Sequence, residues 1–510
     1  MIERIPQALR RPLGLTLVLL VALLVASVVE ARAGQKGLGD FLNWLDTRLH
    51  PAPQELPLPS KAYNESLPAG PLRLKAEEYD LWHRENHQPQ YGATVGTQFT
   101  SNDRSDVLNH FDYGDSTIWT GTYLASQAFR YYVTGDPAAK DNVLNTVDAL
   151  DGHLHVTGVP GFIARYRSKQ NPWVLDQACE THPRCHLVNS GPYAGDAWWG
   201  ETSRDQYTGW FYGMSLAYDL VDDEDMRDLI RDDVSEVLDK LISDDWWIRD
   251  EEDKPTDAGP NVLPIQQLSW SLVGYHMTGN KAYEDVVKKW IDDGQHTALW
   301  IATFSLLNRY SQYYGNNLGH QNFYTLLRLA PSYFGEKDTD YFKDLFEDQQ
   351  HDNVRLSHNA YFTEIFMSVG NYDPSLFDGL VDPYLTQVVQ DLADFRDAPN
   401  YKYYVDPTDL PIDPLSETLV DLWEQYPILE TLMGGVDLQS LEAHTVDEQC
   451  STDFLWQRSP FDVGHGGNGG FEQSPGLDLI EPYWLARHTG VITEGEGLVL
   501  AWEDTGACEE

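Results

Sequence analysis

The stretch GETSRDQYTGWFYGMSLAYDLVDDEDMRDLIRDDVSEVLDKLISDDWW, residues 200–247, changes character twice along its length. Charged residues at 201–205 precede a segment, 207–221, that is apolar or aromatic on nearly every side, which is the pattern of a buried helix. After the DDED break, apolar residues recur at the three- and four-residue spacing of one helical stripe, with acids on the other face. The stretch therefore predicts a buried inner helix, a tight turn and an amphipathic outer helix.

The same succession recurs along the chain. It appears at 114–154, where the break is TGDP, at 262–294, where the break is TGNK, and in two segments that begin at Leu318 and Leu356. Repeated helix pairs are typical of an array or a closed ring, and the uneven spacing of these pairs favours the ring. We count about six pairs if either 297–314 or 476–492 completes the ring, and strand signals are few. The expected fold is all-α, an (α/α)6 toroid with long rim loops.

The N-terminal residues predict export. Three arginines precede the apolar run Leu13–Val29, and ARAG follows with a small-residue cleavage site after Ala33, so 1–33 is expected to be a signal peptide. The alternative is an uncleaved membrane anchor, because the run is close to the length that spans a bilayer. Residues 34–71 contain a proline-rich tether, and a single toroid domain is expected from 72 to 510. The mature protein would be periplasmic or extracellular.

The charge of the chain limits its partners. A formal net charge of -45 over 510 residues makes nucleic acid or an anionic membrane an unsuitable partner, because the average field repels both. A membrane becomes a partner only if the N-terminal segment is retained. Most of the acids are expected to form a solvated surface, and only carboxylates placed among aromatic residues point to chemistry. The sequence does not indicate an oligomeric state.

The chain contains four cysteines, an even number that predicts disulfides in an exported protein. The expected pairs are Cys179 with Cys185 and Cys450 with Cys508. A zinc site in CETHPRCH, residues 179–186, is the alternative, but its ligand spacing is tighter than that of common structural zinc sites.

Polar and aromatic residues gather where several inner helices are expected to begin. They occur in HFDYGDSTIW at 110–119, GETSRDQY at 200–207, YYGNNLGHQN at 313–322 and RLSHNAY at 355–361. Helix N-termini attract such groups because their N–H donors are unpaired, so capping is the alternative to function for any single cluster. Capping needs one short polar side chain and does not explain neighbouring His, Arg, Trp and Tyr residues. Several clusters that face one cavity therefore favour a functional site.

The buried inner helix, the Gly-Asp break and the amphipathic outer helix resemble the (α/α)6 toroid of six-hairpin glycosidases and related polysaccharide lyases. The resemblance covers roughly 112–490 and rests on phrases such as GDSTIWTGTYLASQAFRYYVTGDP and TSRDQYTGWFYGMSLAYDLV. It implies an active-site funnel at one end of the ring, lined by loops that lead into the inner helices. It carries no catalytic motif, so no catalytic residue is transferred from a family.

Two chemistries fit the clustered residues, and the residues leave both open. Hydrolysis of a glycosidic bond needs one protonated and one ionised carboxyl group. Elimination from a uronic acid needs a Tyr or His base and a cation or amide that stabilises the intermediate. The candidate catalytic residues are Asp205, Asp115, Glu201, Tyr207 and His320. The candidate substrate-binding residues are Trp119, Arg204, Asn322, His358, Asn359, His465 and Glu472.

Residues 461–484, FDVGHGGNGGFEQSPGLDLIEPYW, are too rich in glycine to hold a packed helix at their start. We interpret the glycine run as a rim loop that brings His465 and Glu472 to the substrate, and a simple closure before the last helix is the alternative. A metal site formed with Asp462 is a further alternative, but its spacing matches no known metal motif. The expectation is therefore no metal and no cofactor.

The predicted function is an exported carbohydrate-active enzyme that cleaves glycosidic bonds of a poly- or oligosaccharide with paired carboxylates. A polysaccharide lyase and a noncatalytic glycan-binding or envelope scaffold protein are the alternatives. Among the candidates, Asp205 is expected to be a functional carboxylate and not a cap, because Ser203 can already accept the hydrogen bonds at the helix start. Arg204 supports this interpretation, because a cation at a helix N-terminus opposes the dipole.

Overall fold

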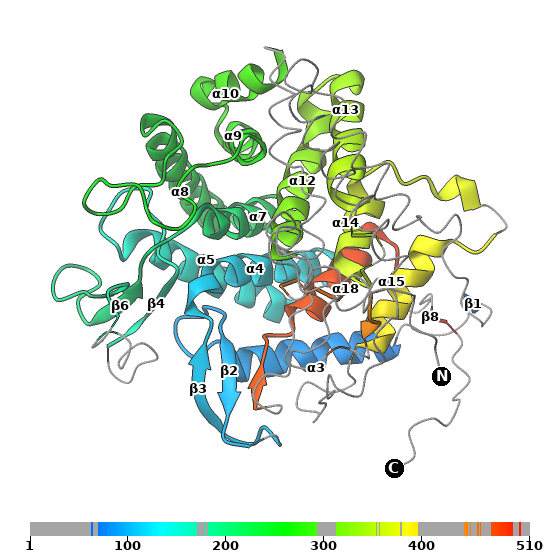
Figure 1. Cartoon of the computed structure of the whole chain (residues 1–510), viewed down its shortest axis with the longest axis horizontal. Helices are drawn as coiled ribbons and strands as arrows, with labels where there is room; N and C mark the ends of the chain where they lie inside the picture. Colours follow the sequence, from blue (N-terminus) through cyan, green and yellow to red (C-terminus); the bar gives the residue numbers. More distant parts are fainter. Residues whose placement is uncertain are drawn as a thin grey trace, which may run out of the picture. The chain divides into compact units, whose positions relative to one another are not determined.

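The computed structural model describes residues 63–64, 70–101, 103–170, 179, 182–292, 313–352, 354–355, 357–377, 380–395, 443–446, 449, 456–457, 459–460, 471–492 and 499–500. Residues 58–510 form one compact unit. The described part of this unit is mostly helical, with small antiparallel sheets at its periphery (Figure 1). The all-α class is therefore confirmed.

The helices follow one another mainly as antiparallel pairs. They are α3 (Gly70–Asn86), α4 (Ser116–Thr134), α5 (Pro137–His155), α7 (Arg204–Leu220), α8 (Glu224–Ser243), α9 (Pro264–Thr278), α10 (Lys281–Asp292), α12 (Tyr314–Tyr333), α13 (Glu336–Phe346), α14 (Ala360–Val369), α15 (Pro383–Asp394) and α18 (Leu477–Thr489). Short 3-10 turns occupy Tyr113–Asp115 and Pro374–Phe377, and a π-helical turn extends α13 over Glu347–His351.

The breaks predicted from the sequence lie between helices. At TGDP, Gly135 ends α4 with a φ of 64°, and the side chain of Asp136 accepts a hydrogen bond from the N–H of Ala138 to start α5. At DDED, Asp223 caps α8 by accepting from the N–H of Met226. At TGNK, Gly279 ends α9 with a φ of 65°. These three predicted turns are confirmed, because left-handed glycines and acidic N-caps are standard helix ends.

The helices divide into a buried and an outer set. Helices α4 and α7 bury nearly all of their side chains, whereas α8 buries a stripe and exposes acids. Within the buried set, α4 packs against α7 and α18, α12 packs against α7, α9 and α14, and α14 packs against α18. The outer helices α5, α8, α10, α13 and α15 each contact the buried helix that precedes them, and α3 contacts α18.

Three small sheets account for the strands of the described residues. One contains β3 (Val107–Phe111), β2 (Gly96–Phe99) and β7 (Glu472–Gln473), and a second contains β4 (Tyr166–Lys169), β6 (Asp196–Trp199) and β5 (Cys185–Leu187). In the third, β1 (Tyr63–Asn64) pairs with β8 (Val499–Leu500).

A disulfide joins Cys179 to Cys185 at the start of β5, with 4.7 Å between the Cα atoms. This pairing is the one predicted, and it excludes a zinc site because the two thiolates are not available as ligands. The remaining members of that proposed site also have other contacts: the ring of His182 packs on Trp199 and the ring of His186 stacks on Trp198.

Helices α4 and α7 approach each other backbone to backbone. A Cβ atom added at Gly121 would overlap the carbonyl oxygen of Gly209, and one added at Gly213 would overlap the carbonyl oxygen of Gly121. A Cβ atom at Gly209 would lie 2.5 Å from the Cα atom of Ile118. The absence of side chains on these glycines lets the two helices touch. Their N-terminal ends are therefore held close together.

Two buried acids lie where the inner helices meet. Glu364 on α14 and Glu481 on α18 are fully buried, and the hydroxyl of Tyr212 donates to Glu481. Burial raises the pKa of Glu364 from 4.5 to about 8. One of its carboxyl oxygens accepts from Thr489, and the other has no hydrogen-bond partner in the described part of the chain. These contacts suit a protonated carboxyl group at neutral pH.

The raised pKa of Glu364 predicts a pH-dependent stability. Because the folded-state pKa of about 8 exceeds the value of 4.5 for an unperturbed Glu, the stability linked to this group is present at acid pH and is lost as pH rises through about 8. Glu364→Gln should therefore gain stability over the wild type when the pH is raised from 5 to about 9. Thermal unfolding at both pH values measures it, with exposed Glu336→Gln as the control. An equal pH dependence in Glu364→Gln and the wild type would contradict this prediction.

Several predictions concern residues outside the described ranges. They are the signal peptide at 1–33, most of the tether at 34–71, the helix pair member at 297–312, the disulfide of Cys450 and Cys508, and the rim-loop residues Asp462 and His465. Among the described helices, none combines the length and apolar character that a bilayer crossing needs.

Candidate functional site

A pocket of about 370 Å³ lies where the N-terminal ends of α4, α7 and α12 meet. Each helix contributes residues from its first turns or its N-cap, and Arg165 and Gln457 from other parts of the chain complete the wall. The lining residues are Asp115, Ile118, Trp119, Arg165, Asp205, Tyr314, Asn317, Leu318 and Gln457. Two predicted carboxylates and one predicted aromatic residue, Asp115, Asp205 and Trp119, are thus brought into one cavity.

Asp115 occupies the N-cap position of α4 but makes no capping hydrogen bond with its side chain. The first N–H groups of α4 are bonded elsewhere, since that of Thr117 donates to the carbonyl of Arg165 and that of Ile118 to the side chain of Gln206. The Asp115 carboxylate is therefore free to face the pocket. It accepts from the amides of Gln206, at 3.3 Å, and Gln457, at 3.0 Å.

Asp205 lies in the first turn of α7, and its side chain is 30% exposed. Ser203 is the N-cap residue, but its side chain makes no capping hydrogen bond with a described backbone N–H. The prediction that Ser203 caps α7 is therefore wrong. Asp205 does not cap the helix either, because its carboxylate accepts no hydrogen bond from a described backbone N–H. What distinguishes Asp205 is its position in the pocket.

The environment of the two carboxylates shifts both pKa values in the same direction. Burial raises the pKa of Asp205, and Arg204 and Arg165 partly oppose the rise. Burial also raises the pKa of Asp115; Arg165 opposes that rise, the Asp205 carboxylate adds to it, and the amides of Gln206 and Gln457 oppose it. Three groups favour the ionised form of each carboxylate: Arg165, Gln206 and Gln457 at Asp115, and Arg204, Arg165 and Ser203 at Asp205.

Arg165 is a pocket residue that the sequence analysis missed. Its Nε atom donates to the carbonyl of Glu201 at 2.6 Å, and its Nη1 atom donates to the carbonyl of Gly114. The same Nη1 atom lies 3.5 Å from the Asp115 carboxylate. These contacts hold the guanidinium group in a fixed position between the loops that precede α4 and α7. The sequence around Arg165, GFIARYRS, carries no helix-start signal that marks it.

The rest of the pocket offers aromatic and amide groups. The indole N–H of Trp119 donates to Asp112 at 3.3 Å, which fixes the ring beside Ile118. Asn317 is 1% exposed, and neither polar atom of its amide has a hydrogen-bond partner within the described ranges. A buried amide without hydrogen-bond partners is costly. The position of Asn317 in the pocket lining therefore indicates an amide that can form hydrogen bonds with a ligand or water. Tyr314 is 47% exposed and lies at the mouth.

Two further candidates lie next to the pocket but do not line it. The carbonyl of Glu201 holds Arg165, and its carboxylate accepts from the N–H of Asp257 at 3.3 Å. The guanidinium of Arg204 donates to Asn261 and lies 4.0 Å from the Asp205 carboxylate. Both residues therefore act on the pocket indirectly, through Arg165 and Asp205.

Tyr207, His320 and Asn322 lie in the core and not in the pocket, so we do not retain them as site residues. The hydroxyl of Tyr207 donates to the carbonyl of Gly161 at 2.9 Å, and Tyr207 is 1% exposed. Burial lowers the pKa of His320 to about 3, and its ring stacks on Phe362. The amide of Asn322 bonds to side chains of α7 and α9. Each of these residues joins helices to one another.

The remaining described candidates also lie away from the pocket lining. His358 contacts the Asp391 carboxylate at 3.1 Å, and Asn359 is the N-cap of α14, where it accepts from the N–H of Phe362. Glu472 lies on β7, paired with Gln98 of β2. Capping is thus the observed role of Asn359, as the alternative interpretation of these clusters allowed.

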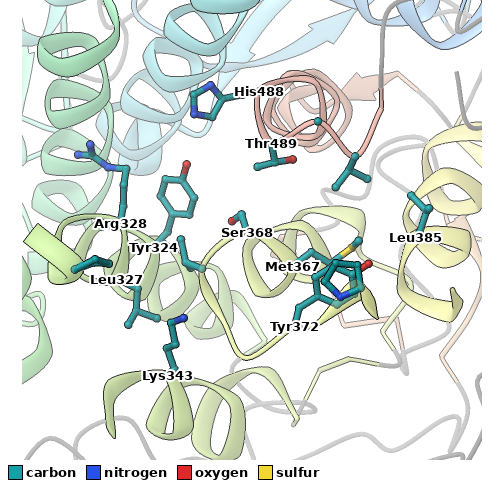
Figure 2. Close-up of a pocket in the computed structure, with 15 residues that line it drawn as sticks. Tyr324, Leu327, Arg328, Lys343, Met367, Ser368, Tyr372, Leu385, His488 and Thr489 are labelled. Atoms are coloured by element: carbon teal, nitrogen blue, oxygen red, sulfur yellow. The ribbon is translucent and has the colours of Figure 1, made fainter. Parts of the chain in front are cut away.

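A second cavity, of about 710 Å³, lies at the opposite ends of the helices, where α12, α14 and α18 finish. Figure 2 shows Tyr324 and Arg328 of α12, Met367 and Ser368 of α14, and His488 near its wall. None of the described lining residues is acidic. Arg328 is already paired with Asp219 of α7. This cavity therefore lacks a carboxylate pair, and the smaller pocket is the better candidate for catalysis.

Comparisons with protein-family models, curated proteins and solved structures found no match to the chain.

Proposed function

We propose that the chain hydrolyses a glycosidic bond of a neutral poly- or oligosaccharide in the pocket between α4, α7 and α12. The observation that carries the proposal is the pair Asp115 and Asp205, two carboxylates of raised pKa from adjacent helix starts that line one pocket. Glycoside hydrolysis needs two such groups in one concave site. Trp119 would stack on a sugar ring, and the Asn317 amide would bond to its hydroxyl groups.

The two acids are assigned different roles by their surroundings. Asp205 receives no hydrogen bond from a described amide side chain, whereas Asp115 receives two, so Asp205 is proposed to stay protonated and to donate its proton to the leaving oxygen. Asp115 receives hydrogen bonds from Gln206 and Gln457 and lies near Arg165, so it is proposed to stay ionised and to activate water or attack the sugar. Activity should fall as pH rises through the raised pKa of Asp205, because the acid form is lost.

The arrangement of the helices supports the glycosidase interpretation. We propose that α4, α7, α9, α12, α14 and α18 form the inner layer of an (α/α)6 toroid, with α3 as the outer partner of α18. Contacts run from α4 through α7, α9, α12 and α14 to α18 and back to α4. In the six-hairpin glycosidases that the sequence resembles, the active site lies at one end of such a ring, and the pocket lies at one end of these helices.

A lyase that acts on uronic acids is less well supported. Tyr314, Asn317 and Arg165 are the residue types that such a reaction uses. However, burial and the Asp205 carboxylate raise the pKa of Tyr314, which opposes the tyrosinate form that a base needs. The ionised Asp115 would also repel the carboxylate of a uronate. A neutral substrate avoids both difficulties.

Export is part of this proposal and rests on the sequence of residues 1–33 alone. The purified chain should be screened against neutral and uronate-containing polysaccharides, with reducing ends and the absorbance of unsaturated uronates as readouts. New reducing ends from a neutral glycan are expected, and the Asp115→Asn, Asp205→Asn double variant, purified in the same way, should produce none. Unsaturated uronates would instead identify a lyase. Glycan binding without cleavage would identify a binding protein.

A further inference from the structure

Four potential metal ligands face one another between the outer helices α5 and α8. Asp151 and His155 are four residues apart on α5, and Asp233 and Glu236 are three residues apart on α8. Residues at these spacings lie on one face of a helix. Because α5 packs against α8, the two pairs meet across the helix contact.

The distances among these groups suit coordination better than hydrogen bonding. Asp151, His155 and Asp233 each offer one ligand atom, and these atoms all lie within 4.8 Å of one another. The Nε2 atom of His155 lies 3.9 Å from the Asp233 carboxylate and 3.6 Å from that of Glu236. Both distances are too long for a hydrogen bond. Two ligands bound to one tetrahedral zinc ion lie ~3.4 Å apart, so a small movement would bring them into its coordination sphere.

The side chain of Asp233 is an independent reason to expect a cation ligand at the cluster. This side chain is 3% exposed, and its Oδ2 atom has no hydrogen-bond partner among the residues that the structure describes. Among the described residues, His155 is the basic group that contacts Asp151, Asp233 and Glu236, and no Lys or Arg forms an ion pair with them. A buried carboxylate without donors or a fixed cation is strongly disfavoured. A divalent ion at this place would bond to the Asp233 carboxylate and add positive charge beside three acids whose described basic neighbour is His155.

His155 is already oriented as a ligand. Its Nδ1 atom lies 2.9 Å from the Asp151 carboxylate and 3.1 Å from the Asp151 carbonyl. A hydrogen bond from Nδ1–H to these oxygens leaves the lone pair of Nε2 directed toward Asp233 and Glu236. Glu236 is held as well, because its other carboxyl oxygen accepts from the N–H of Gly161 at 2.9 Å.

We propose that His155, Asp233 and Glu236, with Asp151 as a fourth ligand or as the group that orients His155, bind one divalent transition-metal ion. One imidazole nitrogen with carboxylate oxygens suits Zn²⁺ or Mn²⁺ better than Mg²⁺, which prefers oxygen ligands alone. The ion joins the outer helices of two pairs whose buried helices, α4 and α7, carry Asp115 and Asp205. None of the four ligands lines the carbohydrate pocket, so the site does not depend on the proposed function.

The test uses the purified full chain after treatment with a chelator. Calorimetric titration with ZnCl2 or MnCl2 should show one bound ion per chain and a rise in melting temperature, and MgCl2 should bind at least tenfold more weakly. His155→Ala, at a side chain that is 35% exposed, and Asp233→Asn should each weaken binding by about a hundredfold or abolish it. Asp232→Asn, the same change at the exposed neighbouring position of α8, should bind as the wild type does.

Binding that is absent in the wild type, or unchanged in both His155→Ala and Asp233→Asn, would overturn the proposal. Equal affinities for Mg²⁺ and Zn²⁺ would overturn the assigned class of metal. The melting temperature of each metal-free variant separates a loss of binding from a loss of folding, since a folded variant melts cooperatively near the metal-free wild type. His155→Ala and Asp233→Asn alter different helices. If one variant misfolds, the metal binding of the other still tests the proposal.

Discussion

Replacing Asp205 by Asn is expected to lower glycoside cleavage by about a hundredfold or more and to leave the melting temperature within a few degrees of the wild type. Asn keeps the shape of the side chain but cannot donate a proton to a leaving group. Stability should be retained because burial already disfavours the Asp205 charge and because its side chain does not cap α7. Initial rates on a responsive glycan and a thermal melt measure the two effects.

The matched control is Asp225→Asn. Asp225 lies in the first turn of α8, as Asp205 lies in the first turn of α7, but it is exposed and outside the pocket. The control should keep its activity. If Asp205→Asn instead loses several degrees of stability and keeps its activity, Asp205 is a structural residue of α7 and the proposed mechanism is wrong.

The roles of the two acids can be separated by the leaving group of the substrate. An aryl glycoside with a good leaving group needs little protonation, so Asp205→Asn should regain much of its rate on it. Asp115→Asn should not regain its rate on this substrate, because water activation or attack on the sugar is still required. Recovery in Asp115→Asn alone would reverse the two assignments.

Replacing Gly121 by Ala is expected to lower the free energy of unfolding by about 3 kcal/mol, the upper end of the usual cost of overpacking. At an exposed helical position the same change usually stabilises by about 1 kcal/mol, because Ala has the higher helix propensity. The sign should reverse here because the added methyl group would meet the backbone carbonyl of Gly209 and not a movable side chain. Helices α4 and α7 would then have to separate.

Gly152→Ala is the control for this prediction. Gly152 is also buried in a helix, α5, but the atoms that its added Cβ would meet belong to the side chain of Arg167. A side chain can move at a smaller cost than a backbone, so the loss of stability should be clearly smaller than for Gly121→Ala. Denaturant unfolding of both variants measures the difference. A gain of stability in Gly121→Ala would show that the two backbones are not in contact.

The pairing of helices could be predicted from the sequence because it depends on local patterns. An all-round apolar segment must be buried wherever it packs, and a striped acidic segment must keep one face in water. The turns at TGDP, DDED and TGNK followed from the same local rules, since left-handed glycines and acidic N-caps act within a few residues. The disulfide between Cys179 and Cys185 could also be predicted from the sequence, because its two cysteines are only six residues apart.

The candidate site was only partly accessible to the same reasoning. Asp115, Asp205 and Trp119 were found because they precede or begin buried helices, the place where a funnel was expected. Tyr207 and His320 belong to the same clusters but point into the core. Periodicity cannot separate the two groups, because a helix that is buried all round has no polar face that marks the side directed to a cavity.

By itself, the sequence determined that this chain forms a helical protein of paired buried and acidic helices, because burial periodicity and helix ends are local properties. Only the tertiary structure decided which polar residues share a pocket. The pocket combines residues from distant parts of the chain, namely Arg165, Tyr314 and Gln457. The glycine contact between α4 and α7 brings the N-terminal ends of these two helices together. The cluster of Asp151, His155, Asp233 and Glu236 was likewise invisible until α5 and α8 met, since a ligand set is defined by distances in space and not by spacing along the chain.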